Sequence, residues 1–163
     1  MDKAQIASMD FILSAVIFFI LIAGVMSFWN IYILRFDANL EQKELVLKAA
    51  KITDLFVENE GSPTGWNETD VAVIGLVSSD RKIDNDKLAS FLNLSYDQVK
   101  SYLNIDENEF YFRVVDLNGA VVKAKGNFAE KGLPPGDVDS IIKIRRIAMY
   151  GSQRAVVEFS LWE

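Results

Sequence analysis

The longest apolar stretch of the chain lies near its N-terminus. Residues 11–34 include no charged side chain over 24 positions. A helix of that length spans ~36 Å, more than the ~30 Å hydrocarbon core of a bilayer. A buried helix of a soluble core rarely has so long an apolar run, and a cleaved secretory signal has a shorter one before a small-x-small site. Since Val25 spoils such a site at Ala23-Gly24-Val25, the pattern predicts a retained transmembrane helix, residues 5–34.

The following residues change to an amphipathic helical pattern, residues 35–59. Neither Gly nor Pro occurs between Arg35 and Glu58, and a Gly-Ser-Pro turn follows. We therefore predict one continuous helix from Gln5 to Glu58. Its second half carries an apolar stripe of Ala38, Leu45, Ala49, Ile52, Leu55 and Phe56. This stripe needs a cover, which is either the chain's own C-terminal domain, the arrangement we favour, or another subunit.

Beyond Gly61 the pattern alternates with period two, which indicates strands. We predict strands at 71–77, 109–116, 120–125, 140–150 and 153–162. Asn118-Gly119 predicts a type I′ turn after the second strand, and Gly151-Ser152 predicts a type II′ turn between the last two. Gly132-Leu133-Pro134-Pro135-Gly136 is typical of a loop.

Two short helices are predicted between the first strand and the hairpins. Asp84 or Asn85 would cap the first, with Leu88, Phe91 and Leu92 facing inward. Ser95 and Gln98 have capping-box spacing for the second, with Val99, Tyr102 and Leu103 inward. The fold class is therefore α+β: a long N-terminal helix, then a small antiparallel sheet with two short helices in a head domain, residues 60–163.

Composition narrows the chemistry. The chain has no histidine, which excludes Ser-His hydrolases and His-bound zinc, and no cysteine, which excludes disulfides and thiol chemistry. Its net charge of −6 disfavours a phosphate-binding surface. The sequence selects no catalytic or metal-binding set, so we expect neither an enzyme nor a cofactor.

Two motifs have a functional interpretation that we weigh against a structural one. Residues 87–103 have the spacing of a helix-turn-helix, yet Gln98, Lys100 and Ser101 are all that the second helix would offer to DNA. We prefer a helical hairpin that covers the sheet, and no nucleic-acid partner. Asp80, Asp84 and Asp86 suggest a calcium loop, but the Gly and terminal Glu of an EF-hand are missing.

Surface chemistry adds two further expectations. The basic residues of the C-terminal half are expected on the solvent face of alternating strands: Lys123, Lys125, Lys131, Lys143, Arg145 and Arg146. Asn67-Glu68-Thr69 and Asn93-Leu94-Ser95 are N-glycosylation motifs, and both are predicted to lie in loops. N-glycosylation of Asn67 or Asn93 would place the head outside the cytoplasm.

The first ten residues resemble the class III (prepilin) signal peptide of archaeal type IV pilin-like proteins. The resemblance rests first on Lys3-Ala4-Gln5, which has the family's cleavage pattern of a basic residue, a small residue and the residue that becomes the new N-terminus. It rests also on Ser8-Met9-Asp10-Phe11, which resembles the polar and acidic residues that precede the family's apolar helix. It covers about 30 residues closely. Bacterial pilins have Glu as the fifth mature residue, whereas Asp10 would be the sixth here.

The resemblance implies that a prepilin peptidase cuts between Ala4 and Gln5, which removes residues 1–4 as a leader and retains the apolar helix. It further implies assembly through Gln5, Asp10 and Phe11, with Asp10 paired to the new Gln5 amine of a neighbouring pilin subunit. The partners would be membrane lipid, the peptidase and other pilin subunits, and the head would be extracellular, on a single-pass anchor or a surface filament.

Charge next to the apolar run leaves topology open. Lys3 is the only basic side chain before it, whereas Arg35, Lys43, Lys48 and Lys51 follow, and the positive-inside rule would then place the head in the cytoplasm. Two alternatives to a pilin subunit are an uncleaved membrane-anchored surface domain that binds a partner and a membrane-anchored helix-turn-helix regulator. An ordinary signal-anchor that happens to contain Lys-Ala-Gln fits the first alternative.

Overall fold

A computed structural model describes the backbone of residues 3–79, 81–138 and 140–163, and side chains within residues 9–33, 42–79, 81–138 and 140–163. The chain divides into two compact units, Met1–Lys43 and Glu44–Glu163. Helix α1, Lys3–Glu58, supplies the described part of the first unit and the beginning of the second. The predicted helix is therefore confirmed, and it ends at Glu58 as the Gly and Pro beyond that residue predict.

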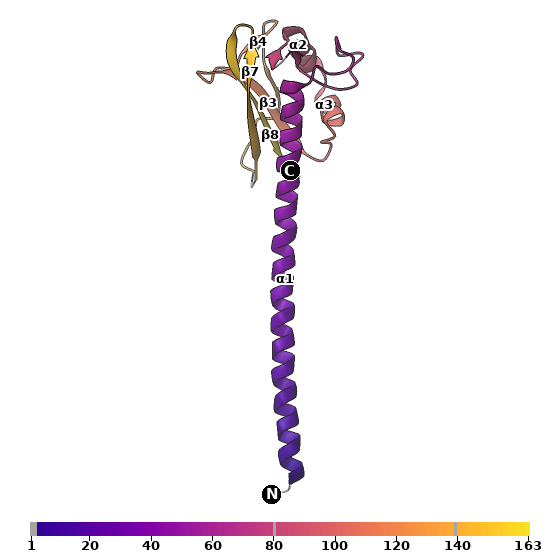
Figure 1. The fold of residues 1–163 in the computed structure, drawn as a ribbon, viewed down its shortest axis with the longest axis vertical. Helices are drawn as coiled ribbons and strands as arrows, with labels where there is room; N and C mark the ends of the chain where they lie inside the picture. Colours follow the sequence, from indigo (N-terminus) through magenta and orange to yellow (C-terminus); the bar gives the residue numbers. More distant parts are fainter. Residues whose placement is uncertain (1–2, 80, 139) are drawn as a thin grey trace. The chain divides into compact units, whose positions relative to one another are not determined.

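The second unit combines short helices with a mixed sheet, which confirms the α+β class (Figure 1). Among the described residues the main sheet has the order β1-β2-β7-β8-β3-β6, and β4 and β5 form a separate pair. The elements after α1 are α2 (Asn85–Asn93), α3 (Tyr96–Leu103) and the strands β1 (Val77–Ser79), β2 (Lys82–Ile83), β3 (Glu109–Asp116), β4 (Lys123–Ala124), β5 (Asn127–Phe128), β6 (Glu130–Gly132), β7 (Ile142–Tyr150) and β8 (Gln153–Trp162). The prediction of a purely antiparallel sheet is wrong, because β2 pairs in parallel with β7.

The last turns of α1 pack on one face of this sheet. Ala49, Ile52, Phe56 and Val57 are buried, and Leu45 and Leu55 pack against the same core. Within this unit the chain's own sheet therefore covers the stripe, as we favoured; Ala38 lies outside the described side chains. Phe56 contacts the rings of Phe91 in α2, Phe112 in β3 and Phe159 in β8. This aromatic cluster joins the helix, the sheet and the helical hairpin.

The two short helices follow their predicted caps. The Asp84 side chain accepts from the backbone N–H groups of Asp86 and Lys87, and Ser95 forms a reciprocal capping box with Gln98. Leu88, Phe91, Val99 and Leu103 are buried and Leu92 is half-buried, as predicted. Tyr102 is exposed, so its inward orientation was wrong. Tyr96, Val99 and Leu103 have i, i+3, i+7 spacing and supply the inner face instead.

The predicted strand at 71–77 is wrong, because only Val77 belongs to β1. Val71, Ile74 and Leu76 are buried without the alternation of a strand. The segment packs against the turn after α1: Trp66 donates its indole N–H to the Gly75 carbonyl at 2.8 Å, and a Cβ at Gly75 would collide with the Asn59 carbonyl. The β-branched run is therefore buried as irregular backbone in the core and not as a strand of the sheet.

The hairpin predicted at the last two strands is confirmed. Tyr150 pairs with Gln153 around Gly151, whose φ of 62° suits the first position of a type II′ turn. The predicted I′ turn at Asn118-Gly119 is wrong, because Gly119 has a positive φ and Asn118 does not. The hairpin predicted around this turn forms in part: Val115 and Val121 make an isolated antiparallel bridge, and the Val122 N–H donates to the Val114 carbonyl. The rest of the strand predicted at 120–125 shrinks to β4, which pairs with β5, because β6 takes the same edge of β3 at residues 111–113.

Candidate functional site: the apolar half of helix α1

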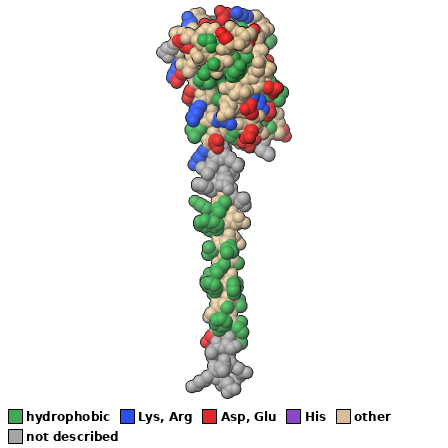
Figure 2. Space-filling view, turned by 90° about the vertical axis from the view of Figure 1, so that its right-hand side faces the viewer, with side chains coloured by type: hydrophobic (Ala, Val, Ile, Leu, Met, Phe, Trp, Pro, Cys, Tyr) green, Lys and Arg blue, Asp and Glu red, His purple; other side chains and the backbone are tan. Residues whose placement is uncertain are grey.

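Among the described residues, one helical segment, Met9–Ile33, is long and apolar enough to cross a membrane. It has 25 residues and a mean hydropathy of 2.7, and none of it is buried within the chain. A signal sequence near an N-terminus has the same properties. Apolar side chains gather along the face of this segment that Figure 2 shows; Phe11 is 75% exposed and Phe19 is 67% exposed.

An apolar surface of this extent requires an environment other than water. Monomeric soluble proteins rarely expose contiguous apolar patches above a few hundred Å². Within the helix all backbone groups except those at the ends bond internally, which is the condition for crossing a hydrocarbon layer. The segment can therefore insert in lipid or pack against apolar helices of other molecules.

The predicted processing and assembly residues lie at the start of this helix. Lys3, Ala4 and Gln5 belong to α1, but their side chains lie outside the described ones, as do residues 1 and 2 altogether. Asp10 and Phe11 are both exposed, next to each other where the apolar segment begins. A carboxylate thus stands at the edge of the apolar surface, where pairing with a cation would stabilise it.

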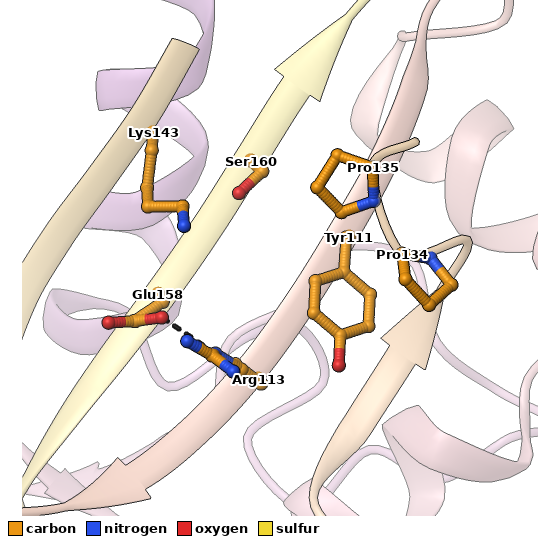
Figure 3. Close-up of a pocket in the computed structure, with 7 residues that line it drawn as sticks. All are labelled: Tyr111, Arg113, Pro134, Pro135, Lys143, Glu158 and Ser160. Carbon is orange, nitrogen blue, oxygen red and sulfur yellow. Dashed lines mark hydrogen bonds and ion pairs between the residues drawn. The ribbon is translucent and has the colours of Figure 1, made fainter. Parts of the chain in front are cut away.

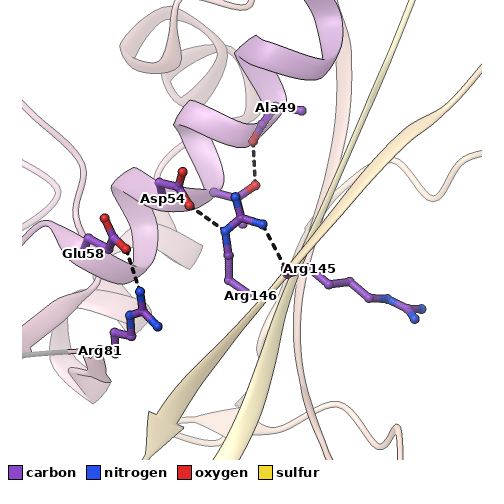
Figure 4. A network of polar contacts seen from close by, with 7 residues as sticks. Ala49, Asp54, Glu58, Arg81, Arg145 and Arg146 are labelled. Carbon is purple, nitrogen blue, oxygen red and sulfur yellow. Dashed lines mark hydrogen bonds and ion pairs between the residues drawn. The ribbon is translucent and has the colours of Figure 1, made fainter.

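In contrast to Met9–Ile33, the last turns of α1 are attached to the globular unit by polar contacts as well as by the core. The Arg146 guanidinium of β7 donates to Asp54 at 2.6 Å, and Arg81 pairs with Glu58 at 3.0 Å (Figure 4). The hydrogen bond to Asp54 raises the pKa of Arg146. The buried Thr53 hydroxyl donates to the Ala49 carbonyl, so it needs no partner outside the helix.

The helical hairpin uses its polar side chains for its own structure. Gln98 accepts from the Ser95 N–H in the capping box, and Lys100 pairs with Glu109 at 3.0 Å with its side chain 12% exposed. The Tyr96 hydroxyl also donates to Glu109, and burial followed by this bond raises the pKa of Tyr96 to about 12. The same two bonds, Tyr96 first, lower the pKa of Glu109. Two of the three side chains that a recognition helix would present are therefore engaged.

The two glycosylation motifs differ in local structure. Asn67 is exposed in a turn, as predicted, and its amide oxygen accepts from the Thr69 N–H and hydroxyl. Asn93 is exposed but is the last residue of α2, so its predicted loop position was wrong. Helix α2 extends to it because the turn between the helices is only Leu94 and the capping residue Ser95.

The other sequence candidates have separate structural roles. Asp84 caps α2, Asp86 pairs with Lys125 at 2.9 Å, and Asp80 lies outside the described residues. The basic residues of the C-terminal half were predicted to face solvent. This prediction is wrong for Lys131 and for Arg146, which bonds to Asp54 on α1. Lys131 donates to two carbonyls at the end of α2, and its burial lowers its pKa. Lys123 lies over the Phe128 ring, whereas Lys143 and Arg145 are exposed as expected.

Two buried charges were not singled out from the sequence. Lys87 donates to the Glu60 and Val77 carbonyls, each at 2.8 Å, and Glu158 lies between two arginines of the neighbouring strands. The alternation of β8 places Glu158 on the face opposite the core, but its partners are 45 and 13 residues away in the chain.

Comparisons with protein-family models, curated proteins and solved structures found no match.

Proposed function

We propose that this chain is a membrane-anchored, pilin-like subunit that assembles into a surface filament through its N-terminal helix. The observation that carries the proposal is the unburied apolar segment Met9–Ile33 in a helix that continues to Glu58. Because the globular unit covers the amphipathic stripe of residues 45–57 with its own core, the segment Met9–Ile33 is the part of the described helix left for lipid and sister copies.

The two stages of such a subunit place different demands on this segment. In the membrane its apolar side chains face lipid. In a filament the same side chains pack against those of neighbouring subunits, and Asp10 meets the amine of Gln5 that removal of residues 1–4 creates. The pairing relieves the cost of a carboxylate at the edge of an apolar environment, which gives the cleavage a physical purpose.

The alternative of an uncleaved anchor for a surface domain uses the same helix without processing or assembly. The regulator alternative has less support, since Gln98 and Lys100 are engaged within the hairpin. Cleavage therefore distinguishes the proposal from both alternatives.

The first experiment measures the intact mass of the protein extracted from its native membrane. We expect the mass to lack residues 1–4, with Gln5 as the N-terminus. Lys3→Glu or Ala4→Leu should leave an uncut precursor, whereas Lys43→Glu, a matched charge reversal far from the cleavage position, should be processed normally. Normal processing of both leader variants would refute the prepilin interpretation.

A second experiment separates anchoring from assembly. Asp10→Asn should leave membrane insertion intact but reduce the protein recovered from cells by shearing, because the subunit loses its pairing charge. Asp106→Asn, a matched change at an exposed residue of the head, should leave recovery unchanged. Equal recovery for Asp10→Asn and the native protein would argue against Asp10 as an assembly residue.

Protease treatment of intact cells determines topology. Digestion of the head without lysis is the expected result for a surface subunit. Protection of the head until lysis would place it in the cytoplasm, as the distribution of Lys and Arg around the apolar run suggests.

A further inference from the structure

A row of four charges, Glu130, Arg113, Glu158 and Arg145, crosses the sheet face opposite the core. Arg113 on β3 and Arg145 on β7 are each the register partner of Glu158 on β8. The Arg113 Nε lies 2.7 Å from one Glu158 oxygen and the Arg145 Nε lies 2.7 Å from the other. Glu158 itself is only 5% exposed. A buried carboxylate thus holds two guanidinium groups on a solvent-facing surface.

The arrangement leaves positive charge and hydrogen-bond donors in surplus. Glu158 and Glu130, the register partner of Arg113 on β6, balance the charges of the two arginines, so the surplus positive charge is that of Lys143 on β7. Both oxygens of Glu158 are already occupied. Arg113 uses its Nε for Glu158, so its two terminal nitrogens have no bond to the described part of the chain. The bond to Glu158 is the main reason that the pKa of Arg113 is raised, so the guanidinium stays charged.

A cavity of about 230 Å³ opens beside this row (Figure 3). Its polar lining is Arg113, Lys143, Ser160 and Glu158, whose carboxylate is already paired with Arg113. Tyr111, Pro134 and Pro135 form the less polar walls. The Lys143 ammonium forms no ion pair or hydrogen bond to any side chain or backbone group that the structure describes. In Figure 3 its side chain and that of Ser160 border the same space, opposite the two prolines.

Ser160 supplies a further donor. The residue is 2% exposed and its hydroxyl bonds to no described residue. Ser160 lines the cavity, which is where its hydroxyl can meet a bound molecule.

We propose that this cavity binds the carboxylate of an acidic monosaccharide unit, such as a uronic acid. Arg113 and Lys143 would bind the carboxylate through charge-assisted bonds, and Ser160 would bond a ring hydroxyl. The faces of Tyr111, Pro134 and Pro135 would contact the apolar C–H face of the ring. The volume of about 230 Å³ lies below the ~300–1,000 Å³ typical of pockets for drug-sized ligands, which suits one sugar ring and not an extended chain.

An acidic peptide has less support at this position. Peptides recognised on sheets usually add a strand to a free edge. Here Lys143, Ser160 and Tyr111 lie on three adjacent strands in register, Tyr111 with Ser160 and Lys143 with Ser160. The backbone beneath the cavity is therefore engaged in the sheet, and recognition depends on side chains.

The experiment titrates the full chain in detergent micelles with glucuronate and, as a neutral match of the same ring, with glucose, and measures binding by calorimetry and by NMR shifts. Lys143→Met removes a cation that has no other described partner. Lys82→Met is its control, because Lys82 is also an exposed strand lysine but lies on β2. Arg113 stays unchanged, since Glu158 depends on it.

We expect glucuronate to bind about tenfold or more tightly than glucose, and Lys143→Met to weaken it about tenfold, as the loss of one charge-assisted bond implies. Lys82→Met should bind as the native protein does. Equal binding of the two sugars, no binding of glucuronate, or an unchanged affinity in Lys143→Met would overturn the proposal. So would a di-glutamate peptide that binds more tightly than glucuronate. None of these results depends on filament assembly.

Discussion

Replacing Phe56 by alanine tests whether the last turns of α1 belong to the core of the globular unit. Phe56 is fully buried, and its ring lies 5.2–5.8 Å from those of Phe91, Phe112 and Phe159. Removal of a buried phenylalanine ring costs about 3–5 kcal/mol. Edge-to-face pairs add about 0.5–1.5 kcal/mol beyond area burial, so we expect the upper half of that range.

A loss of about 4 kcal/mol is a large share of the ~5–15 kcal/mol that stabilises a typical domain. With a urea slope of about 2 kcal/mol per molar, the unfolding midpoint would fall by about 2 M. The assay is urea unfolding of the full chain in micelles followed by near-UV circular dichroism, which reports tertiary packing and not the helicity of the apolar segment.

Leu47→Ala is the matched control on the same helix. Leu47 is 60% exposed, so its truncation should change the free energy of unfolding by less than about 0.5 kcal/mol. If Phe56→Ala and Leu47→Ala had equal urea midpoints, the apolar stripe of α1 would not be part of the head's core. Another subunit would then be expected to pack against it.

Three further substitutions test the described packing. Gly75→Ala should destabilise the head by more than about 2 kcal/mol, because its Cβ would collide with the Asn59 carbonyl, whereas Gly65→Ala, with open space around it, should be neutral in the same urea assay. Lys87→Met should cost about 1–3 kcal/mol, because two buried carbonyls lose their donor; a midpoint equal to the native one would contradict this. The pKa of Glu109 is lowered in the folded state, so its contribution to stability is complete above the unfolded pKa and is lost as pH falls through the folded pKa. The urea midpoints measured from about pH 6 to about pH 3 should therefore fall less steeply in Glu109→Gln than in the native protein.

Local patterns predicted several elements well because their signals lie within a few residues. The helix to Glu58 required only an unbroken run of helix formers and a Gly-Pro stop. The caps at Asp84 and Ser95 depend on backbone N–H groups two or three residues later. The last hairpin needed only Gly151 between two alternating runs.

The failed predictions share a different property. Residues 71–76 are strand-like, but in the described structure they form one isolated bridge, between Val73 and Ser62, and fill the core beside Trp66 instead. The strand expected at 120–125 bridges to β3 at Val121 and goes no further along it, because β6, which comes later in the chain, takes the same edge of β3 at residues 111–113. Strand propensity states what a segment prefers, and the free edge that it needs depends on the rest of the fold.

The sequence by itself determined the long helix, its apolar and amphipathic halves, the α+β class and the absence of histidine and cysteine chemistry, because composition and periodicity are properties of neighbouring residues. Only the tertiary structure decided the parallel pairing of β2 with β7, the burial of Lys87, and the grouping of Arg113, Glu158 and Lys143 around one cavity. These features join residues that are far apart in the chain, and strand order and register bring them within contact distance. The sheet therefore created a cationic pocket on an acidic chain, a feature that net charge could not indicate.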